Sequence, residues 1–141
     1  MTATRIITLK ALGAATTLAI AGQAAASDCA VFDALDTPEA PEAQESATCA
    51  TYLTKTAATG VSCHWEFPYR SDVAHRFFET VWANLQTCRP GVLRETGNRV
   101  NHPDSYDLRE WVAQSGVYAV SKKDKAAAER TLVFLRFEPR D

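Results

Sequence analysis

Hydrophobic and polar residues alternate without a break from residue 61 to residue 67, and Pro68 follows directly. A two-residue period is typical of a strand with one buried face, and a proline often ends such a strand. The segment therefore predicts a strand whose two faces differ in polarity. The apolar face carries Val61, Cys63, Trp65 and Phe67, and the polar face carries Ser62, His64 and Glu66.

A helical pattern follows this strand. Ser71 is placed to cap the helix, and Asp72 puts a negative charge in the first turn, where the helix dipole favours it. Apolar residues then recur at steps of three and four, until Pro90 and Gly91 stop the pattern. The spacing predicts an amphipathic helix over residues 71–88. Its apolar stripe consists of Ala74, Phe77, Phe78, Val81, Trp82, Leu85 and Cys88.

The segments on either side of this unit give weaker patterns. Residues 47–57 fit a strand by their threonines and a helix by their alanines, so both remain open. Residues 91–107 are polar and rich in turn formers, with one short strand as an option. Asp104 as a cap, and Leu108, Trp111 and Val112 at helical spacing, predict a short helix over residues 104–115.

The C-terminal part predicts a β-hairpin, because the β-rich runs 117–121 and 131–137 are joined by a charged segment. The second run is apolar on both faces, with Leu132 and Phe134 pointing away from the other apolar set. A strand of this kind needs cover on both sides. The helix over 71–88 would cover one side, so Leu132 and Phe134 form a candidate surface for the short helix, the N-terminal arm or a partner protein.

These elements together predict an α+β fold, in which a small antiparallel sheet of three to five strands packs on one main helix and two disulfides join the parts. The 115 residues that remain of the 141 without residues 1–26 are enough for one domain and too few for two.

The N-terminus carries the pattern of a signal peptide. Arg5 and Lys10 precede an uncharged apolar run over residues 11–21, which matches the roughly 7–15 residues of a signal-peptide core and is shorter than the about 20 residues of a spanning helix. Small residues then predict cleavage after Ala26. A retained anchor is the weaker alternative, and Cys29 follows Asp28 instead of the small residue that lipidation needs. We expect a periplasmic or secreted protein without a membrane anchor.

Charge is distributed unevenly along the expected mature chain. Without residues 1–26 the chain has 13 basic and 17 acidic residues, and residues 27–54 contain six acids and no base. Two prolines in the acidic stretch favour an extended tether. The expected organisation is a signal peptide (1–26), an acidic arm (27–48) and a single domain (49–141). A chain of this charge offers no footprint for nucleic acid.

The four cysteines predict a disulfide framework, because an even number in a small exported chain is typical of one. Gaps of 19, 13 and 24 residues disfavour a zinc site, which usually contains close pairs. The predicted strand and helix each turn an apolar face, and one cysteine, toward the other. This geometry favours the pairs Cys63–Cys88 and Cys29–Cys49.

Few residues indicate chemistry. The sequence lacks a nucleophile elbow, a phosphate-binding glycine loop, a metalloprotease helix and a dinucleotide fingerprint. His64 and Glu66 share one strand face and could hold a metal or a proton, and His102 lies in an acidic loop. The simpler interpretation of His64 and Glu66 is a solvated strand face, and that of the His102 loop is a helix cap.

The function that follows is a non-catalytic role as a binding or accessory protein without a cofactor, with a protein as the expected partner. One alternative is a small periplasmic hydrolase or metal-binding protein that uses His64 and Glu66 or the His102 loop. Another is binding of a small ligand between helix and sheet.

Overall fold

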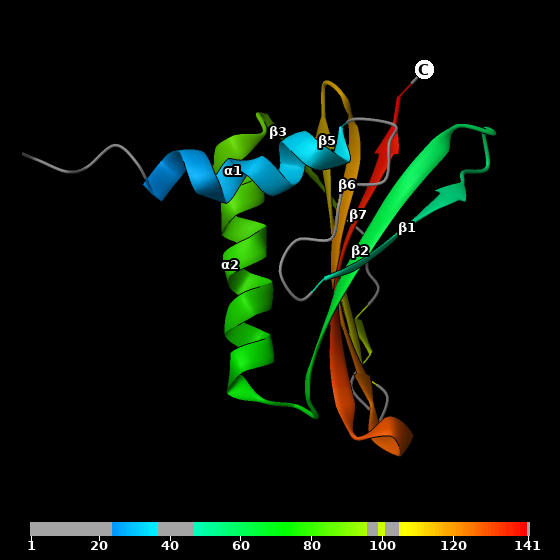
Figure 1. Cartoon of the computed structure of the whole chain (residues 1–141). Coiled ribbons are helices and arrows are strands. Elements are labelled where there is room, and N and C mark those ends of the chain that lie inside the picture. Colours follow the sequence, from blue (N-terminus) through cyan, green and yellow to red (C-terminus); the bar gives the residue numbers. More distant parts are fainter. Residues whose placement is uncertain (1–23, 37–46, 96–98, 101–104, 141) are drawn as a thin grey trace, which may run out of the picture.

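The fold is an antiparallel sheet that carries two helices on one face (Figure 1). The computed structural model describes residues 24–36, 47–95, 99–100 and 105–140. The helices are α1 (Ala24–Leu35) and α2 (Asp72–Cys88), and a short 3-10 turn, η1, spans Ala126–Ala128. The strands are β1 (Thr48–Leu53), β2 (Thr59–Pro68), β3 (Gly91–Arg94), β4 (Arg99–Val100), β5 (Tyr106–Ala113), β6 (Gly116–Lys125) and β7 (Arg130–Pro139).

The strand order is β1-β2-β7-β6-β5-β3, and β4 pairs with β5. Every pairing is antiparallel. The predicted fold class is therefore wrong in its proportions: the described chain is mostly sheet, with seven strands instead of three to five and two helices instead of one. The additional strands come from the segments whose patterns were weak.

The central strand, helix and hairpin are confirmed. β2 covers the alternating segment, and α2 begins after Ser71, whose Oγ accepts a hydrogen bond from the Ala74 backbone N–H at 3.2 Å. β6 and β7 form the C-terminal hairpin over longer runs than predicted. Its turn ends at Glu129, which adopts a left-handed backbone with φ of 50°.

The helix predicted over residues 104–115 is wrong, because the segment from Tyr106 forms strand β5. β5 pairs with β6 along one edge and with β3 and β4 along the other, so its backbone hydrogen bonds go to neighbouring strands. Contacts between Arg109 and helix α2 also stabilise the strand. The Arg109 guanidinium lies 4.5 Å from the centre of the Phe78 ring and donates two hydrogen bonds to Glu79, at 2.9 and 2.7 Å. Tertiary pairing here overrides a helical spacing.

The hydrophobic core lies between the helices and the sheet. The buried face of α2 packs on β2, β6 and β7, and Trp65 contacts Phe77 edge to face at 5.0 Å between ring centroids. α1 adds Phe32 and Leu35, both buried, and Phe32 meets Tyr118 at 6.1 Å. The start of the expected acidic arm is thus a helix of the core. Residues 37–46 of that arm lie outside the described residues.

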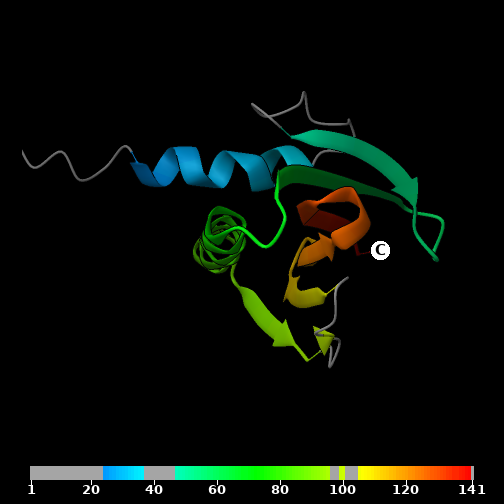
Figure 2. The ribbon, with the colours of Figure 1, turned by 90° about the horizontal axis from the view of Figure 1, so that it is seen from below.

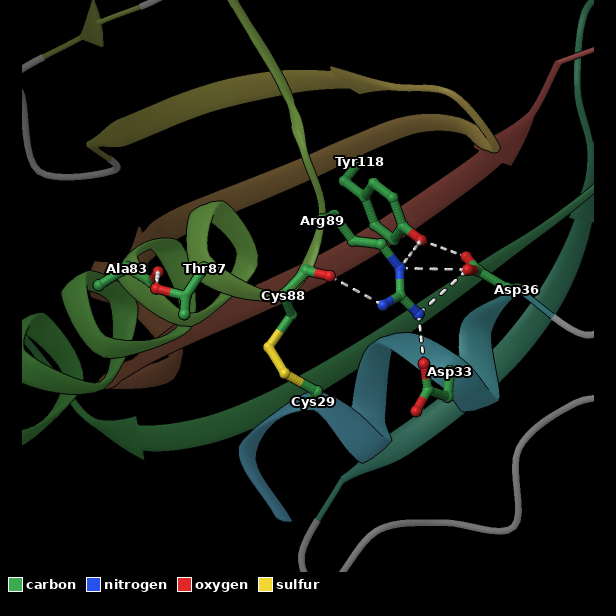
Figure 3. The surroundings of a disulfide bond; sticks show 8 residues. All are labelled: Cys29, Asp33, Asp36, Ala83, Thr87, Cys88, Arg89 and Tyr118. Atoms are coloured by element: carbon green, nitrogen blue, oxygen red, sulfur yellow. Dashed lines mark hydrogen bonds and ion pairs between the residues drawn. A yellow bond between two sulfur atoms is a disulfide. The ribbon is translucent and has the colours of Figure 1, made fainter. Parts of the chain in front are cut away.

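All four cysteines form disulfides, but the predicted pairs are wrong: the bonds join Cys29 to Cys88 and Cys49 to Cys63. Cys49 and Cys63 are direct cross-strand partners in the β1–β2 pair, with Cα atoms 4.0 Å apart. α1 lies across the C-terminal end of α2, which brings Cys29 to Cys88 (Figures 1 and 3). The predicted pairing is wrong because the sequence pattern does not predict α1, and because it leaves residues 47–57, which contain Cys49, open between strand and helix.

Candidate binding surface on the open face of the sheet

The sheet has one face that the helices cover and one that they leave free. Figure 2, which looks along α2, shows the sheet curving around this helix. We call the other side the open face. The cross-strand register places three rows of side chains on it, namely Ser62–Arg136–Ala119–Glu110, His64–Phe134–Ser121–Leu108 and Glu66–Leu132–Lys123–Tyr106.

A hollow of about 230 Å³ lies in the middle of the open face. It forms because small residues occupy the floor while large residues stand around them: Ala119 and Ser121 are 4% and 7% exposed, and Phe134 rises beside Ser121. We call this feature the hollow. Its lining residues are Ser62, Tyr106, Leu108, Ala119, Ser121, Lys123, Phe134 and Arg136.

The hollow is bordered by two cations. The Nε atom of Arg136 is buried, and no described residue accepts a hydrogen bond from it. An oxygen of Glu138 lies 3.9 Å from it. That carboxylate already accepts a hydrogen bond from the Tyr52 hydroxyl at 3.0 Å. Within the described residues the side-chain amine of Lys123 forms no ion pair.

Four of the residues singled out from the sequence, His64, Glu66, Leu132 and Phe134, lie on this face. His64 and Glu66 share it as predicted, with Nε2 and Oε1 3.9 Å apart. Glu66 is also bound by Arg130 at 2.6 Å, and the His64 ring lies 5.4 Å from the ring of Phe134. Leu132 is the cross-strand neighbour of Glu66. The histidine–carboxylate pair and the candidate partner surface are therefore parts of one surface.

A metal site at these residues has no support in the described part of the chain, where no three His, Cys, Asp or Glu side chains gather closely enough to hold an ion. His102 lies outside the described residues. The hollow itself was missed by sequence reasoning. Its only signal was the small pair Ala119 and Ser121 at alternate positions, which becomes meaningful once the register sets Ser121 beside Phe134.

A second polar cluster lies near the N-terminus of α2 and has a structural role. The carboxylate of Asp124 is buried and accepts hydrogen bonds from Thr131 at 2.6 Å, from Arg70 at 3.2 Å and from Ser105. Burial raises the pKa of this carboxyl, but the hydrogen bonds from Ser105, Thr131 and Arg70 lower it and prevail, so the pKa lies below its ordinary value. The cluster is satisfied internally and joins the turn before α2 to the β6–β7 hairpin.

We expect Asp124→Asn to lower the free energy of unfolding at neutral pH by about 1–3 kcal/mol, because the charge-assisted hydrogen bonds are lost. A folded-state pKa below the unfolded value stabilises the protein above the unfolded pKa, about 3.9, and this contribution disappears as pH falls through the folded pKa. Chemical unfolding between about pH 7 and pH 2 should therefore show the two proteins converging in acid. Asp72→Asn, at an exposed site, is the control. A difference in the free energy of unfolding that persists at low pH would contradict the stabilising role of the ionised Asp124 carboxylate.

A third cluster fixes α1 to the rest of the fold (Figure 3). Arg89 donates to Asp33 at 2.6 Å, to Asp36 at 3.2 Å, to the Tyr118 hydroxyl at 3.1 Å and to the Cys88 carbonyl at 3.1 Å. Burial, together with a hydrogen bond to Asp36, raises the pKa of Tyr118 to about 12, so its hydroxyl stays protonated. Two acids of the expected arm are thus partners of one arginine beside the Cys29–Cys88 bond.

Comparisons of the chain with protein-family models, with curated proteins and with solved structures give no match. Among the residues that the structure describes, no helix combines the length and the apolar character needed to span a membrane. Two disulfides are consistent with a small exported protein.

Proposed function

We propose that the chain is an exported, non-catalytic binding protein, and that the open face of its sheet binds a partner protein. The signal-peptide pattern of residues 1–26 and the two disulfides support export. The expected location is the periplasm or the medium.

The observation that carries the proposal is the composition of the open face. Leu132 and Phe134 lie half-buried on the strand side opposite the helices, together with Tyr106 and Leu108. Aromatic and apolar groups gathered around a hollow, with polar groups at the rim, are typical of protein interfaces. This composition favours binding over the alternatives at His64 and Glu66, which have one arginine partner and no third ligand among the described residues. The hollow also lies on the sheet face opposite α2, not between helix and sheet.

The test begins with the mature protein as bait in a cell-envelope extract, followed by identification of the captured protein and calorimetry with the purified pair. We expect Phe134→Asp to weaken the affinity by about 30-fold or more, as for a central interface residue. The matched variant, with both His64→Ala and Glu66→Ala, should change it by less than about threefold, as for rim positions.

Circular dichroism and thermal melts must show both variants folded. An unchanged affinity of folded Phe134→Asp would refute the proposal. If the folded His64/Glu66 variant lost the biological activity of the protein while Phe134→Asp kept that activity, a catalytic or metal site would replace partner binding as the proposed function.

A further inference from the structure

The hollow on the open face has the electrostatics of an anion site. Arg136 and Lys123 line it, and no acidic residue of the described part of the chain does. The described acidic side chains elsewhere on this face have other partners: Glu110 lies 3.4 Å from Arg94, and Glu66 binds Arg130. Glu138 accepts a hydrogen bond from Tyr52 and lies 3.9 Å from the Nε atom of Arg136. Among the described residues, the positive charge at the hollow is therefore balanced only by Glu138, at 3.9 Å from Arg136.

The two cations stand at opposite ends of the hollow. Arg136 belongs to the row that contains Ala119, and Lys123 to the row that contains Leu132. These rows are separated by the row of Phe134 and Ser121, so they lie about 13 Å apart along the strands. Both side chains are long enough to reach inward, and the Ser121 hydroxyl offers a donor between them. A carboxylate above Ser121 would meet a cation on each side.

The burial and exposure of Arg136 support binding of a carboxylate at the hollow. Its Nε is buried, while 41% of the side chain is exposed, so other atoms of this side chain can reach a ligand from solvent. A guanidinium offers two parallel N–H groups that match a carboxylate. Phe134 and Leu108 provide an apolar wall for the methylene groups that precede such a carboxylate.

The size of the hollow indicates a side chain instead of a free ligand. At about 230 Å³ it is smaller than the roughly 300–1,000 Å³ of typical small-molecule pockets, which bury most of their ligand. It has room for one anchoring side chain, and such anchors commonly fill a central pocket of a protein interface.

We infer that the hollow receives one acidic side chain of the partner protein, with Arg136 and Lys123 binding its carboxylate and Phe134 and Leu108 packing its stem. This inference rests on the proposed function and names the chemistry of the partner.

The first probe is the peptide acetyl-Leu-Glu-Leu-amide, compared with acetyl-Leu-Gln-Leu-amide and with free glutarate by NMR titration of the mature protein. We expect the glutamate peptide to bind about tenfold more tightly than the glutamine peptide and to shift the Arg136 Nε–H resonance. Arg136→Gln and Lys123→Gln should each weaken its binding by about tenfold. Arg94→Gln, a cation of the same face that is already paired with Glu110, is the control and should leave binding unchanged.

Three outcomes would overturn the inference: equal binding of the two peptides, shifts that lie away from the hollow, or glutarate binding as tightly as the glutamate peptide, which would indicate a free organic acid. A partner that is lost with Phe134→Asp but unaffected by Arg136→Gln and Lys123→Gln would refute the acidic anchor and leave the proposed function intact. If the partner still bound to Phe134→Asp and to both glutamine variants, the acidic anchor and the proposed function would both be refuted.

Discussion

Replacing Cys29 and Cys88 together by alanine is expected to lower the free energy of unfolding by about 4 kcal/mol. The bond closes a loop with a sequence separation of 59 residues. In the chain-entropy model a longer loop means a larger restriction of the unfolded chain, and so a larger stabilisation of the folded one. The same replacement at Cys49 and Cys63, whose separation is 14, should cost about 3 kcal/mol.

The structure adds a second reason for this ranking. Cys29 lies on α1, and the bond to Cys88 holds that helix next to Arg89, which binds Asp33 and Asp36. Losing the bond should loosen α1 and expose Phe32, whereas β1 keeps its six cross-strand pairs with β2 when Cys49 and Cys63 are replaced. Chemical unfolding of the three proteins measures the difference, and full reduction of the wild type, which should be less stable than either variant, is the control. A less stable Cys49/Cys63 variant would contradict the ranking.

The sequence predicted those elements whose pattern is local. The alternation in β2, the Ser71 cap and the stripe of α2 depend on neighbours in the chain, and each is found where it was expected. β5 was missed because its decisive contacts are distant: its backbone pairs with β3, β4 and β6, and Arg109 packs on α2 through Phe78 and Glu79. No local pattern within residues 104–115 contains that information.

The candidate site also combines features that a local pattern predicts with features that depend on distant strands. The shared face of His64 and Glu66, and the outward direction of Leu132 and Phe134, follow from the period of a strand and could be predicted. That these pairs lie side by side depends on the β2–β7 register, in which Phe134 is opposite His64 and Leu132 is opposite Glu66. The hollow needs a third strand, because its floor comes from β6. The disulfide pairs likewise depend on the position of α1, in a segment whose composition predicts only an acidic arm.

Two neighbouring residues of β7 should respond very differently to the same change. Leu135 is fully buried beneath the helices, whereas Phe134 is half-buried on the open face. Leu135→Asp would place an unpaired charge in the core and leave a cavity, and we expect it to cost more than about 4 kcal/mol and to abolish the cooperative fold. Phe134→Asp removes an aromatic contact with His64 at a site that water can reach, so we expect a loss of about 1 kcal/mol.

Thermal melts and near-ultraviolet circular dichroism of the two variants test this contrast, with Phe134→Leu as a control that keeps the apolar surface. The comparison also decides how the binding experiment can be interpreted, since loss of a partner by Phe134→Asp has meaning only in a folded protein. If Phe134→Asp unfolded the domain as Leu135→Asp does, the side chain would be part of the core, and the open face would no longer be a free binding surface. If Leu135→Asp remained folded, the assignment of the covered face itself would be wrong, because a lone carboxylate beneath two helices has no described partner to offset its loss of water.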